Sequence, residues 1–306
     1  MALVINHNLM AMNAARNLTL AYNQLSISTR RLSSGLRVGT AADDAAGLAI
    51  RELMRSDIRS LNQGVRNAND AISLIQTADG ALQTIDEKLI RMKELAEQAA
   101  TGTYTSDQRL IIDSEYQAMA SEITRIANAT DFNGIYLLNG NLSAADANPA
   151  TWGDNYDGSG LNSKGPLKVH FGTGNDSAED YYYIAIGTAT ASAFGLGNSA
   201  DPTAAGYTIS TQEAASKALT AIDAAIISKD RIRANLGALQ NRLASTVSNV
   251  QIQAENLQAA ESRISDVDVA TEMTQFVRNQ ILTQSAVAML AQANSLPRMA
   301  LQLISG

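Results

Sequence analysis

Residues 58–99 read IRSLNQGVRNANDAISLIQTADGALQTIDEKLIRMKELAEQA, and their apolar side chains recur every three or four residues. This spacing is typical of a helix whose apolar stripe follows a heptad. If fully helical, the segment spans roughly 63 Å. That length exceeds the core of a compact domain, so the sequence predicts a helical rod. The stripe comprises Ile58, Leu61, Val65, Ala68, Ile72, Ile75, Ala78, Leu82, Ile85, Leu89, Met92, Ala96 and Ala99.

A second long helical pattern begins near residue 211 and mirrors the first. Leu236, Leu243, Val250 and Leu257 are spaced by seven. Because amphipathic helices bury matching stripes against each other, we expect the two halves of the chain to pack as a bundle. The rod core that we expect consists of Ile72, Ile75, Leu82, Leu236, Leu243, Val250 and Leu257.

Between these halves the composition changes. A shorter helix is expected over residues 107–128, with Leu110, Ile111, Tyr116, Met119, Ile123 and Ile126 as its apolar stripe. Twelve of the 20 glycines and three of the four prolines then lie between residues 134 and 206. The runs LKVHF, YYYIAIG and YTIST predict short strands. We therefore expect a small β-rich insert that faces solvent.

The two ends of the chain contain no acidic residue in 1–42 or in 273–306. Such weakly charged helices are poor lone surface helices, because they lack the charged face that keeps a helix solvated. We expect them to pair with each other and to become buried between many copies of the chain. The assembly seam that we expect consists of Leu18, Tyr22, Leu25, Leu32, Val277, Ile281 and Leu290.

The predicted terminal helices run over residues 8–34 and 269–296, with a break at 265–268 and a short apolar tail after Pro297. The fold class is therefore mainly α, a long coiled-coil-like bundle with a small inserted β-rich domain. We expect three parts: a terminal coiled-coil assembly domain, a helical rod domain and a variable surface insert. Their respective residues are 1–44 with 265–306, 45–140 with 211–264, and 141–210.

Little in the sequence points to chemistry. A net charge of −7 argues against nucleic acid as a partner, and the absence of cysteine excludes disulfides and Cys-ligated metals. There are two histidines, His7 and His170, and no acidic residue lies near His7, so a His-based catalytic or zinc site would have to recruit partners from far away. Asp43 and Asp44 are interpreted as acidic residues at a helix start rather than metal ligands. We expect no enzyme activity, no cofactor, no metal site and no membrane span.

Several motifs together resemble bacterial flagellin. They are MALVINHNLMAMNAARNL at the start, RLSSGLRVGTAADDAAGLAI after the first helix, FNGIYLLNG before the insert, and AAESRISDVDVATEM with ANSLPRMALQLI at the end. The resemblance implies a structural subunit that self-assembles into the flagellar filament for swimming motility. It also implies terminal helices that form the core between subunits, and an extracellular location reached without a cleavable signal peptide.

The resemblance implies partners as well: many copies of the same chain, the flagellar export apparatus, a secretion chaperone, and the cap and hook-associated proteins. The stretch IRMKELAEQ resembles the segment of flagellins that an innate-immune Toll-like receptor recognises. By that match Arg91, Leu95 and Gln98 are the candidate receptor contacts. Two other functions stay open at this point: a hook–filament junction protein of the same superfamily, and a secreted enzyme carried on a helical rod.

Overall fold

The computed structural model describes residues 8–143, 165–177, 179–197 and 206–305. Its contacts divide the chain into two compact units, each built from both halves of the sequence. Unit 1 contains residues 1–58 and 255–306, and unit 2 contains residues 59–254. Residues 45–58 and 255–264, which we expected in the rod, are therefore grouped with the chain ends.

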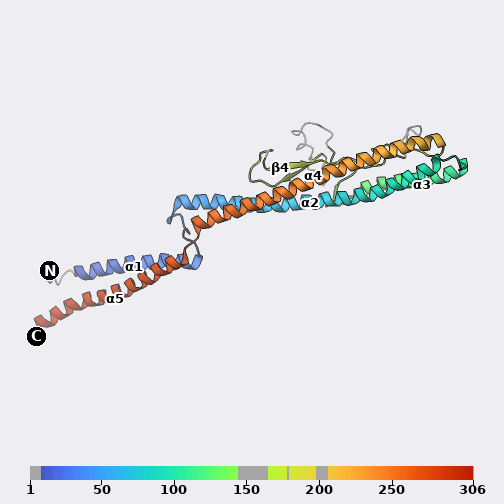
Figure 1. Cartoon of the computed structure of the whole chain (residues 1–306). Helices are drawn as coiled ribbons and strands as arrows, with labels where there is room; N and C mark the ends of the chain where they lie inside the picture. The colour runs from blue at the N-terminus through green and yellow to red at the C-terminus, as the bar shows by residue number, and fades with distance from the viewer. Residues whose placement is uncertain (1–7, 144–164, 178, 198–205, 306) are drawn as a thin grey trace. The chain divides into compact units, whose positions relative to one another are not determined.

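Five long helices dominate the described part of the chain (Figure 1). Short strand pairs accompany them in unit 2. The elements are α1 (Leu9–Ser34), α2 (Ala45–Ala100), α3 (Ser106–Ala129), β1 (Asp131–Phe132), β2 (Ile135–Tyr136), β3 (Leu167–His170), β4 (Tyr181–Ile184), α4 (Gln212–Ser265) and α5 (Val269–Ser305). The prediction of a mainly α chain with a small β-rich part is confirmed.

Local sequence signals explain most helix ends. The Asn8 side chain caps α1 by accepting from the Ala11 amide, and Gly35 ends this helix in the left-handed conformation. Thr105 and Gln108 form a reciprocal capping box at the start of α3. The expected end of the last helix at 296 was wrong, because α5 continues to Ser305 despite Pro297, which removes only one backbone donor.

The core of unit 2 is an aliphatic seam among α2, α3 and α4. Ile75 and Leu82 of α2 are fully buried there, as are Leu236 and Leu243 of α4. Val250 is also buried, and Ile72 is half-buried against the same cluster. Leu257 is half-buried and lies outside this core, in the part of α4 that belongs to unit 1.

Helix α3 buries most of the stripe that we expected, but not its first two residues. Tyr116 and Ile123 are fully buried, and the Tyr116 hydroxyl donates to the Gly206 carbonyl at 2.6 Å. Leu110 and Ile111, however, are exposed at 56% and 71%. The buried stripe instead runs through Ile112, because the helical turn places it, and not its two predecessors, in line with Tyr116.

Ion pairs fix how α2 and α4 align. Lys229, 2% exposed, is paired with Asp86 and lies 2.8 Å from Asp230. One turn further along α4, the Arg233 guanidinium donates to Asp79 at 2.7 Å and lowers the pKa of that carboxyl. A buried lysine is costly unless paired, so sliding one helix along the other would leave this charge uncompensated. The pairs therefore specify the register of the bundle.

The β3–β4 hairpin lies on the helices of unit 2. The strands are antiparallel, and Val169 and Ile184 on one face are buried. The Asn67 side chain of α2 donates to the His170 carbonyl at 2.9 Å, and the Arg242 guanidinium of α4 lies 3.5 Å from the centre of the Tyr182 ring. Residues 144–164 and 198–205 of the expected insert lie outside the described residues.

The third expected strand, YTIST, was wrong. Residues 207–211 form no strand, and the Ile209 amide donates instead to the Asp113 carboxylate of α3 at 2.7 Å. The Asp113 side chain thus accepts the hydrogen bond from this amide, which in a sheet would go to the carbonyl of a neighbouring strand.

Gly64 of α2 sets how closely the hairpin approaches the helix. A Cβ at this position would lie 2.1 Å from the Phe171 carbonyl oxygen, whereas a Cβ at Gly80 would meet nothing within 4 Å. We expect Gly64→Ala to destabilise unit 2 by about 1–3 kcal/mol, because the backbone of the hairpin must shift. The matched control, Gly80→Ala, should stabilise it by about 0.5–1 kcal/mol. Urea unfolding followed by circular dichroism measures both; equal effects would contradict the close packing.

Candidate functional site

Helices α1 and α5 lie side by side in unit 1 (Figure 1), and their Cα atoms come within 8 Å of each other. The Asn8 side chain donates to the Ala293 carbonyl at 2.8 Å, which joins residues 285 positions apart. Such a close approach needs small side chains between the helices.

The seam between the two helices is made mostly of small and polar residues. Its positions follow heptad spacing on both helices, and each is buried or half-buried. They are Ala11, Ala14, Leu18, Ala21, Leu25, Ser28 and Leu32 of α1, and Phe276, Asn279, Thr283, Ala286, Leu290 and Ala293 of α5.

The structure separates the residues of the expected assembly seam into two groups. Leu18, Leu25, Leu32 and Leu290 are half-buried between α1 and α5. The others point away from this seam and are exposed: Tyr22, Val277 and Ile281. The sequence prediction placed the large apolar residues of the last helix at the seam. It did not predict that Asn279 and Thr283 occupy the face of α5 that meets α1.

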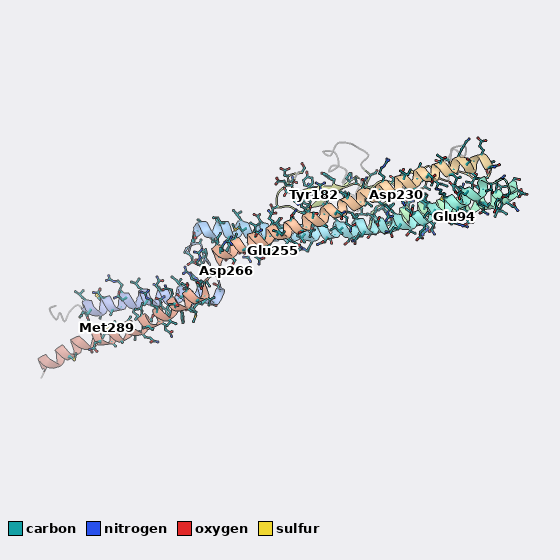
Figure 2. The ribbon with its side chains drawn as sticks, in the orientation of Figure 1. Glu94, Tyr182, Asp230, Glu255, Asp266 and Met289 are labelled. Atoms are coloured by element: carbon teal, nitrogen blue, oxygen red, sulfur yellow. The ribbon has the colours of Figure 1, made fainter. Side chains whose placement is uncertain are left out.

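An apolar groove of about 730 Å³ runs between the two helices on one side of the pair. Four large apolar side chains that line it are exposed: Met10 at 52%, Leu20 at 58%, Leu282 at 47% and Met289 at 64%. Figure 2 labels Met289 on α5. None of these four was singled out from the sequence, although their spacing on the acid-free helices was the available signal.

Helix α5 carries apolar side chains on every face. Besides its half-buried seam residues, it exposes Val269, Met273, Val277, Ile281, Leu282, Val287 and Met289. Its sequence contains only three charged residues, Glu272, Arg278 and Arg298. A helix that is apolar all round is stable when it is covered on all sides. A single α1 helix covers only one of those sides.

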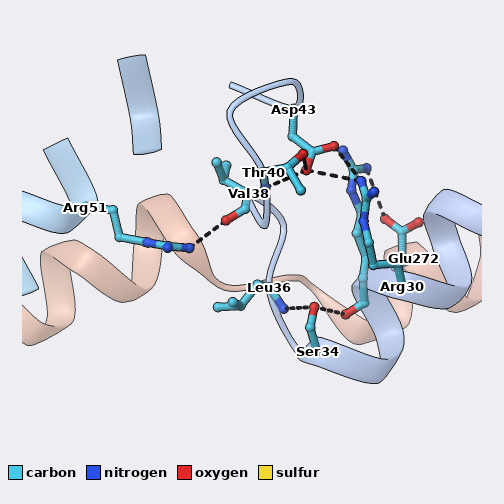
Figure 3. A network of polar contacts seen from close by, with 9 residues as sticks. Arg30, Ser34, Leu36, Val38, Thr40, Asp43, Arg51 and Glu272 are labelled. Atoms are coloured by element: carbon cyan, nitrogen blue, oxygen red, sulfur yellow. Dashed lines mark hydrogen bonds and ion pairs between the residues drawn. The ribbon is translucent and has the colours of Figure 1, made fainter. Parts of the chain in front are cut away.

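Two short connections, residues 35–44 and 266–268, join the helices of unit 1 and are called the joint here (Figure 3). The Arg37 amide donates to the Ser265 carbonyl at 2.7 Å, and the Val267 amide donates to the Gly35 carbonyl at 3.0 Å. These bonds pair the two connections backbone to backbone.

Charged side chains reinforce the joint. The Arg51 guanidinium donates to the Val38 carbonyl at 2.6 Å (Figure 3). Arg31 lies 3.6 Å from Glu272, which is 8% exposed. The Asp43 carboxylate accepts from the Thr40 hydroxyl at 2.8 Å and from Arg30 at 2.9 Å. As expected, Asp44 begins a helix: its carboxylate caps α2 by accepting from the Gly47 amide.

The candidate receptor segment lies on α2 in unit 2. Arg91 is exposed and pairs with Glu94 and Glu115, which raises its pKa. The Gln98 side chain is also exposed and donates to the Tyr104 hydroxyl at 3.0 Å. Leu95 is only 1% exposed. Its expected role as a direct contact is therefore corrected: it packs in the core and supports the helix that carries Arg91 and Gln98.

Nothing in the described ranges gathers three or more His, Asp or Glu side chains as a metal site would. Across the same residues, no helix is long and apolar enough to cross a membrane. The distinctive features of this chain are its uncovered helix pair and its charged joint.

Comparison with known proteins decides the family. Residues 5–143 match the bacterial flagellin N-terminal helical region, and residues 219–304 match the bacterial flagellin C-terminal helical region. The chain belongs to the bacterial flagellin family. Its expected resemblance is thereby confirmed over both ends of the sequence.

Similar flagellins match along nearly their whole length. Flagellin FlaB1 of Treponema pallidum (strain Nichols) is 42% identical over 96% of this chain and 96% of its own. The flagellar filament 33 kDa core protein of Treponema phagedenis is 42% identical over 99% of this chain and 100% of its own. The flagellin of Bacillus subtilis (strain 168) is 41% identical over 98% of this chain and 99% of its own.

Membership of the flagellin family makes this chain a structural subunit of the flagellar filament, an extracellular appendage, and not an enzyme. The hook–filament junction alternative is not favoured, because the relatives that match almost the full chain are flagellins and filament core proteins.

The joint of this flagellin should respond to acid through Asp43. The pKa of Asp43 lies below its ordinary value of 3.8, because the Thr40 hydroxyl, the Thr40 amide and Arg30 all favour the ionised carboxylate. Its contribution is thus complete above 3.8 and is lost as the pH falls through the lower pKa of the folded state. We expect Asp43→Asn to reduce the hydrogen-exchange protection of the Thr40 amide several-fold at neutral pH, with the difference vanishing in acid.

Asp44→Asn is the matched control for this measurement. Asparagine also caps helices, and Asp44 contacts Gly47 rather than Thr40, so the protection of the Thr40 amide should be unchanged. A difference between Asp43→Asn and the parent chain that persists at low pH would contradict the role of the ionised carboxylate.

Proposed function

We propose that the α1–α5 pair is the assembly element of this filament subunit and that copies of the chain cover one another's apolar faces there. The observation that carries the proposal is the set of large exposed apolar side chains around α5 and in the groove. An exposed apolar patch of this extent is typical of an interaction surface.

The free energy of the α1–α5 pair is expected to be lower when several neighbouring copies cover it than when its two helices contact only each other. Each Å² of apolar surface removed from water contributes about 25 cal/mol, whereas each residue held in a fixed conformation costs about 1–2 kcal/mol of backbone entropy. The small side chains of the α1–α5 seam bury little surface, so the pair gains most when neighbouring copies cover its outer faces.

The geometry of such contacts favours an open polymer. The groove and the outer face of α5 are different surfaces, so a contact between them is heterologous. A heterologous contact that does not close into a ring generates a helical array of subunits. This agrees with the filament that the family forms.

The same uncovered surface supports the remaining partners. Before assembly, the groove and α5 need protection from unspecific association. We infer that a secretion chaperone covers this surface inside the cell, that the flagellar export apparatus passes the chain without a cleavable signal peptide, and that cap and hook-associated proteins contact the same helices at the two ends of the filament.

Polymerisation of the purified chain tests the assembly element. We expect Leu20→Gln/Leu282→Gln to raise the critical concentration by about tenfold or more, because two polar amides would be buried in the covered groove. Seeded growth, viewed by negative-stain electron microscopy and quantified by sedimentation, gives that concentration.

The matched control is Ile252→Gln, which places the same amide at a 54% exposed position of α4 in unit 2. Circular dichroism should show the same helical content in all three chains. If the control impairs polymerisation as strongly as the groove variant, the assembly element is not confined to the α1–α5 pair.

We propose a second role for the segment around Arg91, as a contact for an innate-immune receptor of the Toll-like class. Arg91 and Gln98 are exposed in a single copy, which supports this role. Arg91→Ala should weaken the response of receptor-bearing reporter cells to monomer by about tenfold. Arg125→Ala removes a similar exposed Arg–Glu pair from α3 and should leave the response unchanged; an undiminished response to Arg91→Ala would exclude the contact.

A further inference from the structure

The described methionines fall into two groups, those that are buried or half-buried, including Met54 of α2, and those that are exposed. Met92 is fully buried in the core of unit 2, and Met119 packs against that core. Within the part of the chain that the structure describes, every exposed methionine lies on α1 or α5. These are Met10, Met12, Met273, Met289 and Met299.

Two of the exposed methionines face the apolar groove. Met10 of α1 and Met289 of α5 line it together with Leu20 and Leu282. The thioether of methionine suits such a surface, since it is apolar and adapts its shape to a partner. Methionine is also the residue whose sulfur a peroxide would oxidise here, because the chain has no cysteine that would react in its place.

We propose that Met10 and Met289 are an oxidation site that controls assembly, with a peroxide as the oxidant. A lone pair of the thioether sulfur attacks one peroxide oxygen; an S–O bond forms and the O–O bond breaks. The sulfur loses two electrons, and the oxygen bound to it gives its proton to the departing hydroxide, so the products are a sulfoxide and water. No other reactant is needed.

Oxidation changes what the groove can accept. A sulfoxide is polar, and burying a polar group without a hydrogen-bond partner is costly. The groove lining contains eight apolar residues, four large ones and four alanines, and six polar ones: Asn13, Asn17, Gln24, Asn279, Ser285 and Gln292. A sulfoxide at Met10 or Met289 puts a polar group in place of part of the apolar surface that a neighbouring copy would cover. Oxidised monomer therefore fails to dock, whereas a groove already covered by a neighbouring copy excludes the oxidant. This inference rests on the proposed assembly element.

The experiment treats full-length monomer and preformed filaments with dilute hydrogen peroxide and maps the added oxygen by peptide mass spectrometry. We expect Met10 and Met289 to be oxidised at least about tenfold more slowly in filaments, because they are covered there. Treated monomer should show a critical concentration at least about tenfold higher than untreated monomer. Treatment with a methionine sulfoxide reductase should restore polymerisation.

Two variants locate the effect. Met10→Leu/Met289→Leu keeps apolar side chains of similar volume in the groove but removes both sulfurs, so peroxide should no longer impair its polymerisation. Met12→Leu/Met273→Leu removes two exposed methionines that do not line the groove, and it should stay sensitive. Equal sensitivity of the two variants, or equal oxidation rates in monomer and filament, would overturn the inference.

The outcomes separate this inference from the assembly element itself. If untreated parent chain does not polymerise, the assembly element fails. If it polymerises and remains indifferent to peroxide while Met10 and Met289 are oxidised, only the oxidation site fails. If Met10→Leu/Met289→Leu does not assemble even without peroxide, the reductase experiment on the parent chain provides the test. The inference is then overturned if the reductase does not restore polymerisation of the oxidised parent chain.

Discussion

The close approach of α1 and α5 along a seam of small side chains is the constraint on which unit 1 depends. Alanine, serine and asparagine let two helix backbones come near each other, but they remove little apolar surface from water. Several other large residues, such as Leu20 and Leu282, are left on the outside. A pair built in this way keeps apolar surface on its outer faces, which neighbouring copies cover in the assembly that we propose.

Unit 2 has the opposite construction. Its seam is aliphatic, its large side chains point inward, and paired charges such as Lys229 with Asp86 fix the alignment of its helices. It needs no second copy to bury its core. One chain thus combines a self-sufficient bundle with a pair of helices that is incomplete by itself, and the joint with its Arg, Asp and Glu side chains belongs to the incomplete part.

The heptads of the two long helices were readable from the sequence because large aliphatic residues mark every turn, as Ile75 and Leu82 do. The inner face of α5 was not, because Asn279 and Thr283 occupy it while Val277 and Ile281 point outward. Periodicity identifies which residues share a face, but a single sequence does not say which of two apolar faces meets the partner within the same chain. Likewise, no local pattern announces that Asp113 will accept the Ile209 amide and so prevent a strand.

The hydrogen bond between Asn8 and the Ala293 carbonyl also has a consequence for the order in which the parts of the chain fold. It joins positions 285 residues apart, and the seam around it likewise joins the two ends of the sequence. A ribosome releases the N-terminal helix long before its partner exists, so the seam is the last part of the molecule to close. A chain that stops before Val269 lacks α5 and therefore one wall of the groove. Because the seam joins the two ends of the sequence, a chain that stops before Ala293 lacks part of the groove lining.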